Sequence, residues 1–165
     1  MDGGPEGFSG WYAHQHPRVL GMLVALSGQP DVAAEATDEA FVRAFERWAR
    51  VRVMDSPQGW VARVALNELR RRMRRRSLEQ RLRWRWVTRP DAEVVVSDAQ
   101  LWVAVRALPE RQREMVVLRY VADLAEGDIA VVLGVSRGTV ASTLSDARRR
   151  LAGVLDHQEV ERGHA

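Results

Sequence analysis

Hydrophobic residues recur every three or four positions along most of the chain, and this spacing is typical of amphipathic helices. The pattern changes between residues 77 and 97, where LEQRLRWRW can extend as a short helix, TRPDAE is turn-forming and VVV is too short to assign. We therefore predict an all-α protein in which two small helical domains are joined by a flexible linker over residues 77–97. Pro17 is expected to interrupt the first helical segment. The predicted helical segments cover residues 8–27, 31–50, 57–76, 97–108, 109–120 and 123–155.

The segment over residues 57–76 predicts a helix that is apolar on one side and strongly basic on the other. Ser56 can cap its first turn, and Pro57 stands at the first helical position, where a missing N–H costs nothing. Residues 70–76 hold six arginines and no acid. Such a helix is suited to lie on a polyanion, and a solvated basic helix end is the alternative. The apolar side holds Val61, Val64, Ala65 and Leu69, and the basic side holds Arg63, Asn67, Arg70, Arg71 and Arg74.

Basic charge is concentrated in one part of the chain. The net charge is only +3, but residues 50–90 contain thirteen arginines and three acids, whereas the rest contains twelve arginines and nineteen acids. The chain has no lysine, so each basic contact can be bidentate to phosphate or guanine. This asymmetry is the electrostatic footprint expected of a nucleic-acid-binding protein.

The composition argues against several other functions. There is no cysteine, which excludes disulfides, zinc–thiolate sites and thiol nucleophiles. No apolar run reaches the length of a membrane span, and the first residues lack the basic-then-apolar pattern of a signal peptide. The four histidines lie near the two ends, without a phosphate loop, a nucleophile elbow or a carboxylate–histidine cluster. We expect a cytoplasmic protein that is not an enzyme, with no cofactor, no bound metal and no membrane insertion.

Residues 123–155 have the spacing of a helix-turn-helix, with two short helices joined by the sequence LGVS. Ala130 lets the two helices cross, Gly134 takes the left-handed turn, and Val140 locks the second helix down. Ser136 can cap the second helix. A plain helical hairpin is the alternative. The outward side of the second helix, which would face a major groove, holds Arg137, Gly138, Ser142, Ser145 and Arg149.

Three stretches together resemble one known family. They are DEAFVRAFERW at residues 38–48, GWVARVALNELRRRMRRR at residues 59–76 and ALPERQREMVVLRYVADLAEGDIAVVLGVSRGTVASTLSDARRRL at residues 107–151. They resemble regions two and four of bacterial RNA polymerase sigma factors, specifically the small two-domain extracytoplasmic-function group. The resemblance implies a sigma factor that directs core RNA polymerase to specific promoters and initiates transcription, with an anti-sigma factor as a further partner. It implies a region-two-like domain over residues 1–76, the linker over 77–97 and a region-four-like domain over 98–165.

The resemblance also implies a role for each exposed face. The helix over residues 31–48 would dock on the clamp helices of the polymerase's largest subunit, through Glu35, Asp38, Glu39 and Arg43. The helix over residues 57–76 would open and read the minus-ten element, through Trp60, Arg63, Asn67, Arg70, Arg71 and Arg74. Asn67 would border a pocket for a flipped-out base, a task that suits an amide because it both donates and accepts. For Trp60, core packing is the alternative. The second helix of the helix-turn-helix would enter the minus-thirty-five element, through Arg137, Thr139, Ser142, Ser145 and Arg149.

The chain departs from the family pattern in two places. Residues 33–35 read Ala-Ala-Glu, where the family commonly has Ala-Glu-Asp, so one carboxylate is missing. Ala141, Thr143 and Asp146 stand where the recognition helix usually carries basic residues, which predicts weak reading of the minus-thirty-five element. Two alternatives stay open, and the depleted recognition helix supports only the second. A plain helix-turn-helix regulator would explain only the second half of the chain, and a sigma-like regulator would bind polymerase or an anti-sigma partner but read promoters weakly.

Overall fold

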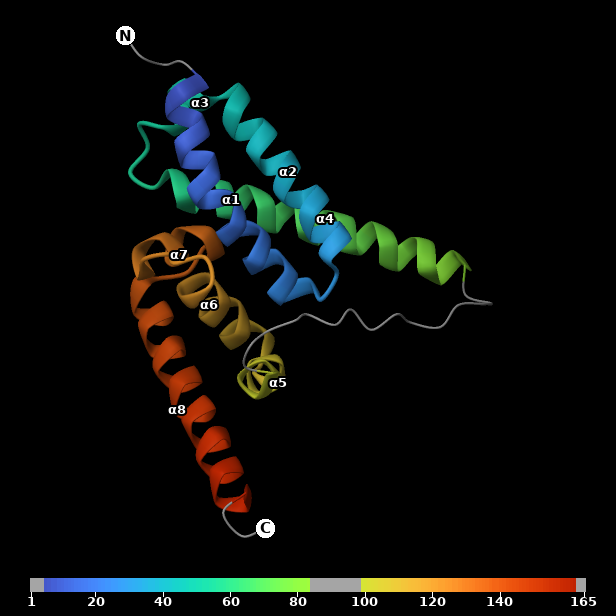
Figure 1. Ribbon diagram of the computed structural model, residues 1–165, viewed down its shortest axis with the longest axis vertical. Coiled ribbons are helices and arrows are strands. Elements are labelled where there is room, and N and C mark those ends of the chain that lie inside the picture. Colours follow the sequence, from blue (N-terminus) through green and yellow to red (C-terminus); the bar gives the residue numbers. More distant parts are fainter. Residues whose placement is uncertain (1–4, 84–98, 163–165) are drawn as a thin grey trace. The chain divides into compact units, whose positions relative to one another are not determined.

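The computed structural model in Figure 1 describes residues 5–83 and 99–162, and it describes side chains in residues 7–78 and 101–153. Every element within these residues is a helix, as predicted. The helices form two compact units, α1–α4 and α5–α8. Their bounds are α1 (Pro5–Ser27), α2 (Pro30–Glu46), α3 (Trp48–Val51), α4 (Pro57–Arg83), α5 (Ala99–Ala107), α6 (Glu110–Tyr120), α7 (Glu126–Leu133) and α8 (Arg137–Arg162).

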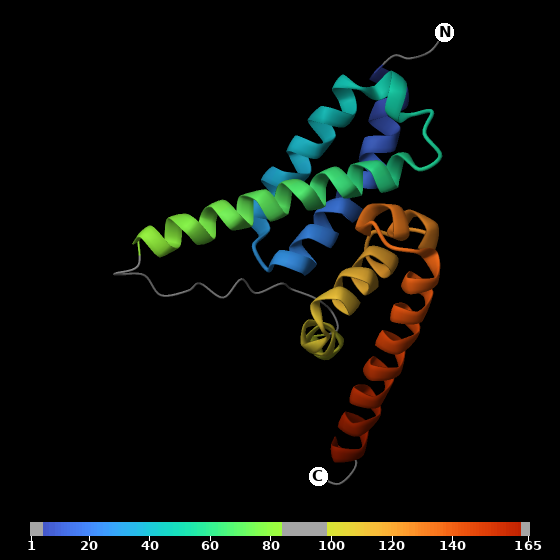
Figure 2. The ribbon, with the colours of Figure 1, turned by 180° about the vertical axis from the view of Figure 1, so that it is seen from behind.

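The first unit is built by α1, α2 and α4, which pack against one another. Figure 2 shows α4 as a long helix that crosses both of the others. Ala33, Ala36 and Ala40 of α2 are fully buried, and such small side chains let neighbouring helices approach closely. The other buried apolar side chains of this unit are Val19, Met22, Leu23, Val32, Phe41, Ala44, Val51, Val61, Ala62, Ala65, Leu66 and Leu69.

The first helix differs from its prediction at Pro17. α1 runs through this residue without interruption. A proline inside a helix removes one backbone hydrogen bond. Val19, Met22 and Leu23 follow it and are buried, because α1 packs against α2 and α4 along this stretch. These apolar contacts offset the lost hydrogen bond and keep the helix continuous.

The second predicted helix, over residues 31–50, is divided into α2 and α3. Arg47 leaves the helical conformation (φ −115°, ψ 19°), and this break turns Trp48 back onto α1. The Trp48 ring lies 4.9 Å from that of Trp11 and 5.3 Å from that of Phe8, and Phe45 lies 5.1 Å from Phe8, all between ring centroids. Aromatic pairs at these separations are favourable, so the cluster compensates for the broken helix.

The basic helix α4 begins where predicted and ends later. Pro57 is its first residue, and the Ser56 Oγ accepts a hydrogen bond from the Gly59 N–H at 3.0 Å. The helix continues to Arg83, so residues 77–83 of the predicted linker are helical. Residues 84–97, the rest of that linker, lie outside the described residues.

The second unit contains the predicted helix-turn-helix, formed by α7 and the start of α8. Gly134 takes the left-handed conformation (φ 67°, ψ 39°), and the Thr139 N–H donates to the Ser136 Oγ at 3.0 Å. Ala130 and Val140 are buried, as their predicted packing roles require. The second helix, α8, is long and runs to Arg162. Its apolar face is the one that the sequence predicts, since Val140, Leu144 and Ala147 are buried and Leu151 is half-buried.

Gly134→Ala is expected to lower the free energy of unfolding of the second unit by about 1–2 kcal/mol, because an L side chain is disfavoured in the left-handed region. An added Cβ would meet no atom within 4 Å, so the effect comes from the backbone alone. Urea unfolding of the full chain, followed by circular dichroism, measures it. Gly138→Ala is the control, since this residue is helical and its Cβ would make an ordinary 3.8 Å contact. Equal midpoints for the two variants would contradict the prediction.

Candidate nucleic-acid interface

One side of α4 presents guanidinium and amide groups to solvent. Arg63, Asn67 and Arg74 are exposed there, and neither arginine has an ion pair within the part of the chain that the structure describes. Trp60 and Arg70 are half-buried on the same side, so Trp60 both packs and stays partly accessible. We name these five residues the α4 stripe. Guanidinium groups can hold phosphates, and the amide between them can read a base edge.

The acid that precedes the arginine run, Glu68, is buried among three arginines. Only 3% of its surface is exposed. Arg71 donates to it twice, from Nε to Oε2 at 3.1 Å and from Nη2 to Oε1 at 2.6 Å, and Arg72 Nε donates to Oε1 at 3.0 Å. Arg43 of α2 approaches to 3.6 Å. The hydrogen bonds from Arg71 lower the pKa of Glu68 below its ordinary value, so the carboxylate is ionised at neutral pH.

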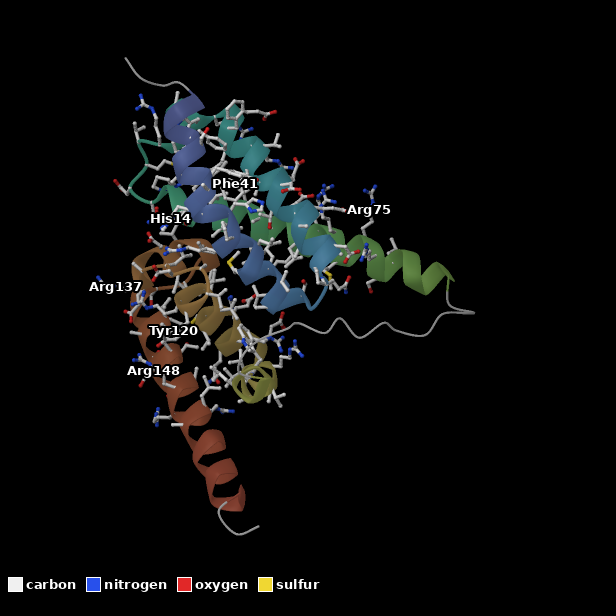
Figure 3. The ribbon with its side chains drawn as sticks, viewed as in Figure 1. His14, Phe41, Arg75, Tyr120, Arg137 and Arg148 are labelled. Carbon is white, nitrogen blue, oxygen red and sulfur yellow. The ribbon has the colours of Figure 1, made fainter. Side chains whose placement is uncertain are left out.

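The last arginines of the run reach across to α2. Arg72 pairs with Glu35, and the Arg76 Nη2 donates to Asp31 Oδ2 at 2.6 Å, which lowers the pKa of Asp31. Figure 3 shows the Arg75 side chain extending outward from α4, and this residue has no ion pair among the described residues. The arginine run therefore has two uses, because some members hold α2 while others stay exposed. The two helices enclose a cleft of about 460 Å³, lined by Val32, Glu35, Arg71, Arg72, Arg75 and Arg76.

The outer face of α2 carries the four residues expected to bind polymerase. Asp38 is the most open of them, with 68% of its side chain exposed and Oδ1 lying 3.3 Å from His16 Nε2. Glu39 accepts a hydrogen bond from Arg43 Nε at 2.8 Å, and both are half-buried. Glu35 is exposed but engaged with Arg72. The structure thus brings these residues to one helix face, on which the Asp38 carboxylate is the most exposed of the three acids.

An apolar groove beside Asp38 was not predicted from the sequence. Its volume is about 330 Å³, and Phe45 on its wall is 55% exposed. The sequence carried a signal for this groove, because Val42 and Phe45 lie four and seven residues after Asp38 and therefore on the same side of the helix. They form an apolar stripe beside the buried apolar side of α2. The groove is lined by Phe8, Tyr12, Asp38, Phe41, Val42 and Phe45.

The recognition helix exposes all five residues predicted for it, which are Arg137, Thr139, Ser142, Ser145 and Arg149. Several of their polar groups already have local partners. The Thr139 Oγ1 lies 2.8 Å from the Ser136 Oγ, and the Ser142 Oγ donates to the Thr139 carbonyl at 3.1 Å. Arg149 pairs with Asp146, one of the residues that depart from the family pattern. Because this ion pair partly neutralises Arg149, the residue attracts phosphate less strongly than the sequence indicates.

Arg148 is an exposed cation of this helix that the sequence prediction missed. Eleven residues separate it from Arg137, so the two residues lie on the same side of α8, and both are labelled in Figure 3. Its Nε donates to the Leu144 carbonyl at 3.2 Å. The eleven-residue spacing was the signal that could have found it.

Comparison with known proteins decides the family. A family model for sigma-70 region 2 matches residues 11–79, and one for sigma-70 region 4 matches residues 98–151. The RNA polymerase sigma-E factor of Streptomyces antibioticus is 30% identical over 138 residues, which cover 80% of this chain and 75% of that protein. The chain belongs to the sigma-70 family, as an extracytoplasmic-function-type sigma factor. The sigma-E factor of Streptomyces coelicolor (strain ATCC BAA-471 / A3(2) / M145) is similar too, at 31% identity over 141 residues, 81% of this chain and 80% of that one.

A solved structure shows the same fold. It is the sigma factor RpoE in complex with the anti-sigma factor NepR from Bartonella quintana, with a TM-score of 0.73 and 22% sequence identity over 92% of this chain and 98% of that one. As a sigma factor, the chain directs core RNA polymerase to promoters and initiates DNA-templated transcription. Sigma factors of this family are non-catalytic initiation factors. A plain helix-turn-helix regulator is wrong, because it leaves the match to region 2 unexplained.

None of the helices in residues 5–83 and 99–162 combines the length and the apolarity that crossing a membrane requires.

Proposed function

We propose that the first unit divides the work of a sigma factor between two of its faces. The outer face of α2, with Glu35, Asp38, Glu39 and Arg43, binds core polymerase, and the α4 stripe together with Arg71 opens and reads the minus-ten element. The observation that carries this proposal is the division of the arginines, since Arg72 and Arg76 are paired with α2 while Arg63 and Arg74 stay available. In this proposal the domains are residues 1–76 and 98–165, and they are joined by residues 77–97, of which residues 77–83 continue α4 as helix.

Asn67 is the proposed reader of an unstacked base. It is exposed midway along the stripe, between Arg63 and Arg74. Cations on both sides would hold the phosphates of the strand, and an amide between them can donate to and accept from one base edge. Trp60, half-buried one turn before Arg63, would support the strand where the duplex opens.

We further propose that the second unit reads the minus-thirty-five element weakly. Ala141 and Thr143 are half-buried, and Asp146 neutralises Arg149. Thr139, Ser142 and Ser145 offer short polar side chains, so Arg137 and Arg148 supply the phosphate contacts. Promoter choice then rests mainly on the minus-ten element.

An anti-sigma factor is the proposed regulator of this protein, and the support is the fold shared with RpoE, whose solved structure contains the anti-sigma factor NepR. We propose a cytoplasmic location for the protein, because a sigma factor acts together with polymerase and promoter DNA. The chemistry of RNA synthesis belongs to the polymerase, so the sigma factor itself acts without catalysis and without a cofactor.

Site-specific photo-crosslinking in the complex of core polymerase, sigma factor and promoter tests the two faces directly. A probe at Arg63 should label minus-ten DNA, and a probe at Val42, exposed beside Asp38, should label the largest polymerase subunit. Each position is the control for the other. Labelling of DNA from position 42 and of protein from position 63 would contradict the assignment.

Arg74→Ala is expected to flatten the salt dependence of promoter binding, because one phosphate contact is lost. The slope of log K against log salt should fall by about 0.9. Arg76→Ala, which removes an equal charge from the same helix but one paired with Asp31, is the matched control and should leave the slope unchanged. Fluorescence anisotropy of the polymerase complex at several salt concentrations measures both. A slope that changes equally in the two variants would remove the distinction between paired and available arginines.

Asp146→Arg is expected to tighten binding of minus-thirty-five DNA by about threefold to tenfold, because it removes a repelling carboxylate and releases Arg149 for phosphate. Anisotropy at fixed salt on specific and scrambled duplexes measures the change, and Arg137→Ala should shift affinity in the opposite direction. Tight and selective binding by the unmodified protein through this element alone would show that the recognition helix is not depleted.

A further inference from the structure

Glu68 is a buried acid to which the family resemblance assigned no task. Within the described residues, Glu68 and Glu114 are the only buried carboxylates, and Glu68 contacts arginines from two helices, α2 and α4. A carboxylate that is only 3% exposed stays ionised only when charged partners lie close to it, because burying an unpaired charge is strongly unfavourable. Its partners, Arg43 of α2 and Arg71 and Arg72 of α4, stand on the elements proposed to bind polymerase and DNA.

The two hydrogen bonds from Arg71 fix the plane of its guanidinium group. Nε and Nη2 face the two oxygens of Glu68 at 3.1 and 2.6 Å, which is the bidentate arrangement that gives an arginine a defined orientation. The side chain nevertheless remains 59% exposed. The third nitrogen, Nη1, is left without a bond to Glu68, so a fixed guanidinium group is offered for a further contact.

The same carboxylate reaches the other face. Arg43 Nη2 lies 3.6 Å from Glu68, and the same nitrogen lies 2.8 Å from Glu39 on the outer side of α2. A continuous series of ion pairs therefore runs from Glu39 through Arg43 and Glu68 to Arg71. It joins residues from two helices that are 25 or more positions apart in the sequence.

We propose that Glu68 is a positioning residue that orients Arg71 for promoter DNA and anchors Arg43 beneath the polymerase-binding face of α2. This inference rests on the proposed function of these two faces. It means that the promoter contact made by Arg71 depends on a buried carboxylate that touches neither DNA nor polymerase.

Glu68→Gln separates positioning from charge. The amide keeps the size of the side chain but loses the negative charge, so Arg71 is released as a mobile, uncompensated cation. Open-complex formation at a minus-ten promoter should fall by about tenfold, a factor equivalent to about 1.4 kcal/mol at 25 °C. Affinity for a non-promoter duplex should not fall, and its salt slope should steepen by up to about 0.9 as one more phosphate is engaged. A purely structural defect would lower both activities together.

The matched control is Asp31→Asn, which removes another carboxylate paired between α2 and α4 but touches neither Arg43 nor Arg71. It should leave open-complex formation within about twofold of the wild type, as expected for an exposed ion pair. Thermal unfolding of each full-length variant checks that it is folded. A Glu68→Gln protein that opens the promoter like the wild type, or that loses promoter opening and non-promoter affinity in parallel, overturns the proposal.

If Glu68→Gln does not fold, Arg71→Lys is the variant to test. Arg71 is exposed, and lysine keeps the positive charge but cannot form the bidentate hydrogen bonds to Glu68. It should open the promoter about tenfold less well, while thermal unfolding shows that the variant is still folded. Wild-type opening by this variant overturns the proposal. If the wild-type protein itself opens no promoter with core polymerase, the proposed function fails and not only the role of Glu68.

Discussion

Asn67→Ala is expected to reduce promoter opening by about tenfold to a hundredfold while the protein stays folded. A base contact through a bidentate amide is worth roughly 1–3 kcal/mol, which sets this range. Asn67 is exposed on the α4 stripe, so the free energy of unfolding should change by no more than about 0.5 kcal/mol. Permanganate footprinting of the polymerase–promoter complex shows the melted region directly and measures the loss.

The effect of Asn67→Ala should be specific to the base that it reads. Substitutions in the minus-ten element should cost the variant less than they cost the wild type, because the contact that distinguishes them is gone. Ser77→Ala is the control, since Ser77 is exposed on the same helix but lies beyond the stripe. Normal opening by Asn67→Ala, with its base preference intact, would remove Asn67 from the proposed pocket.

Reversing two charges on α2 is expected to weaken binding of core polymerase by at least about a hundredfold. Asp38→Lys with Glu39→Lys replaces attraction by repulsion at the proposed contact, and such like-charge contacts cost several kcal/mol. Asp38 is the most exposed acid of the predicted set, so its loss should dominate. Co-purification with core enzyme, followed by a titration of affinity, measures the change.

The matched control for this reversal carries the same change in net charge elsewhere in the chain. Asp55→Lys with Glu110→Lys alters two exposed acids that lie off α2 and are not among the proposed contacts. This control should bind core polymerase nearly as well as the wild type. If both double variants lose binding equally, the effect comes from overall charge and α2 is not the docking face.

Local features of the fold could be predicted from the sequence because each depends on a few neighbouring residues. Ser56 and Pro57 define the start of α4, and Gly134 and Ser136 define the turn of the helix-turn-helix. These residues act through backbone conformation and helix capping, and both are determined by a short stretch of sequence. The break at Arg47 could not be predicted in this way, because it depends on Trp48 reaching aromatic rings on α1.

Which arginines of residues 70–76 form ion pairs with α2 and which stay exposed depends on distant parts of the chain. Arg72 and Arg76 pair with acids 37 and 45 residues away, and no periodicity reveals which charged side chains meet across two helices. The ion pairs that Glu68 forms with Arg71 and Arg72 had a local signal that the prediction did not use. An acid three and four residues before Arg71 and Arg72 has the spacing of helical ion pairs.

Run-off transcription with purified core RNA polymerase and genomic promoter templates tests the central claim most directly. Addition of this protein should produce transcripts from defined start sites, and mutation of the minus-ten element of those templates should abolish them. Binding of the protein to core polymerase without any promoter-specific transcript would contradict the account, and it would favour a sigma-like regulator that reads promoters weakly.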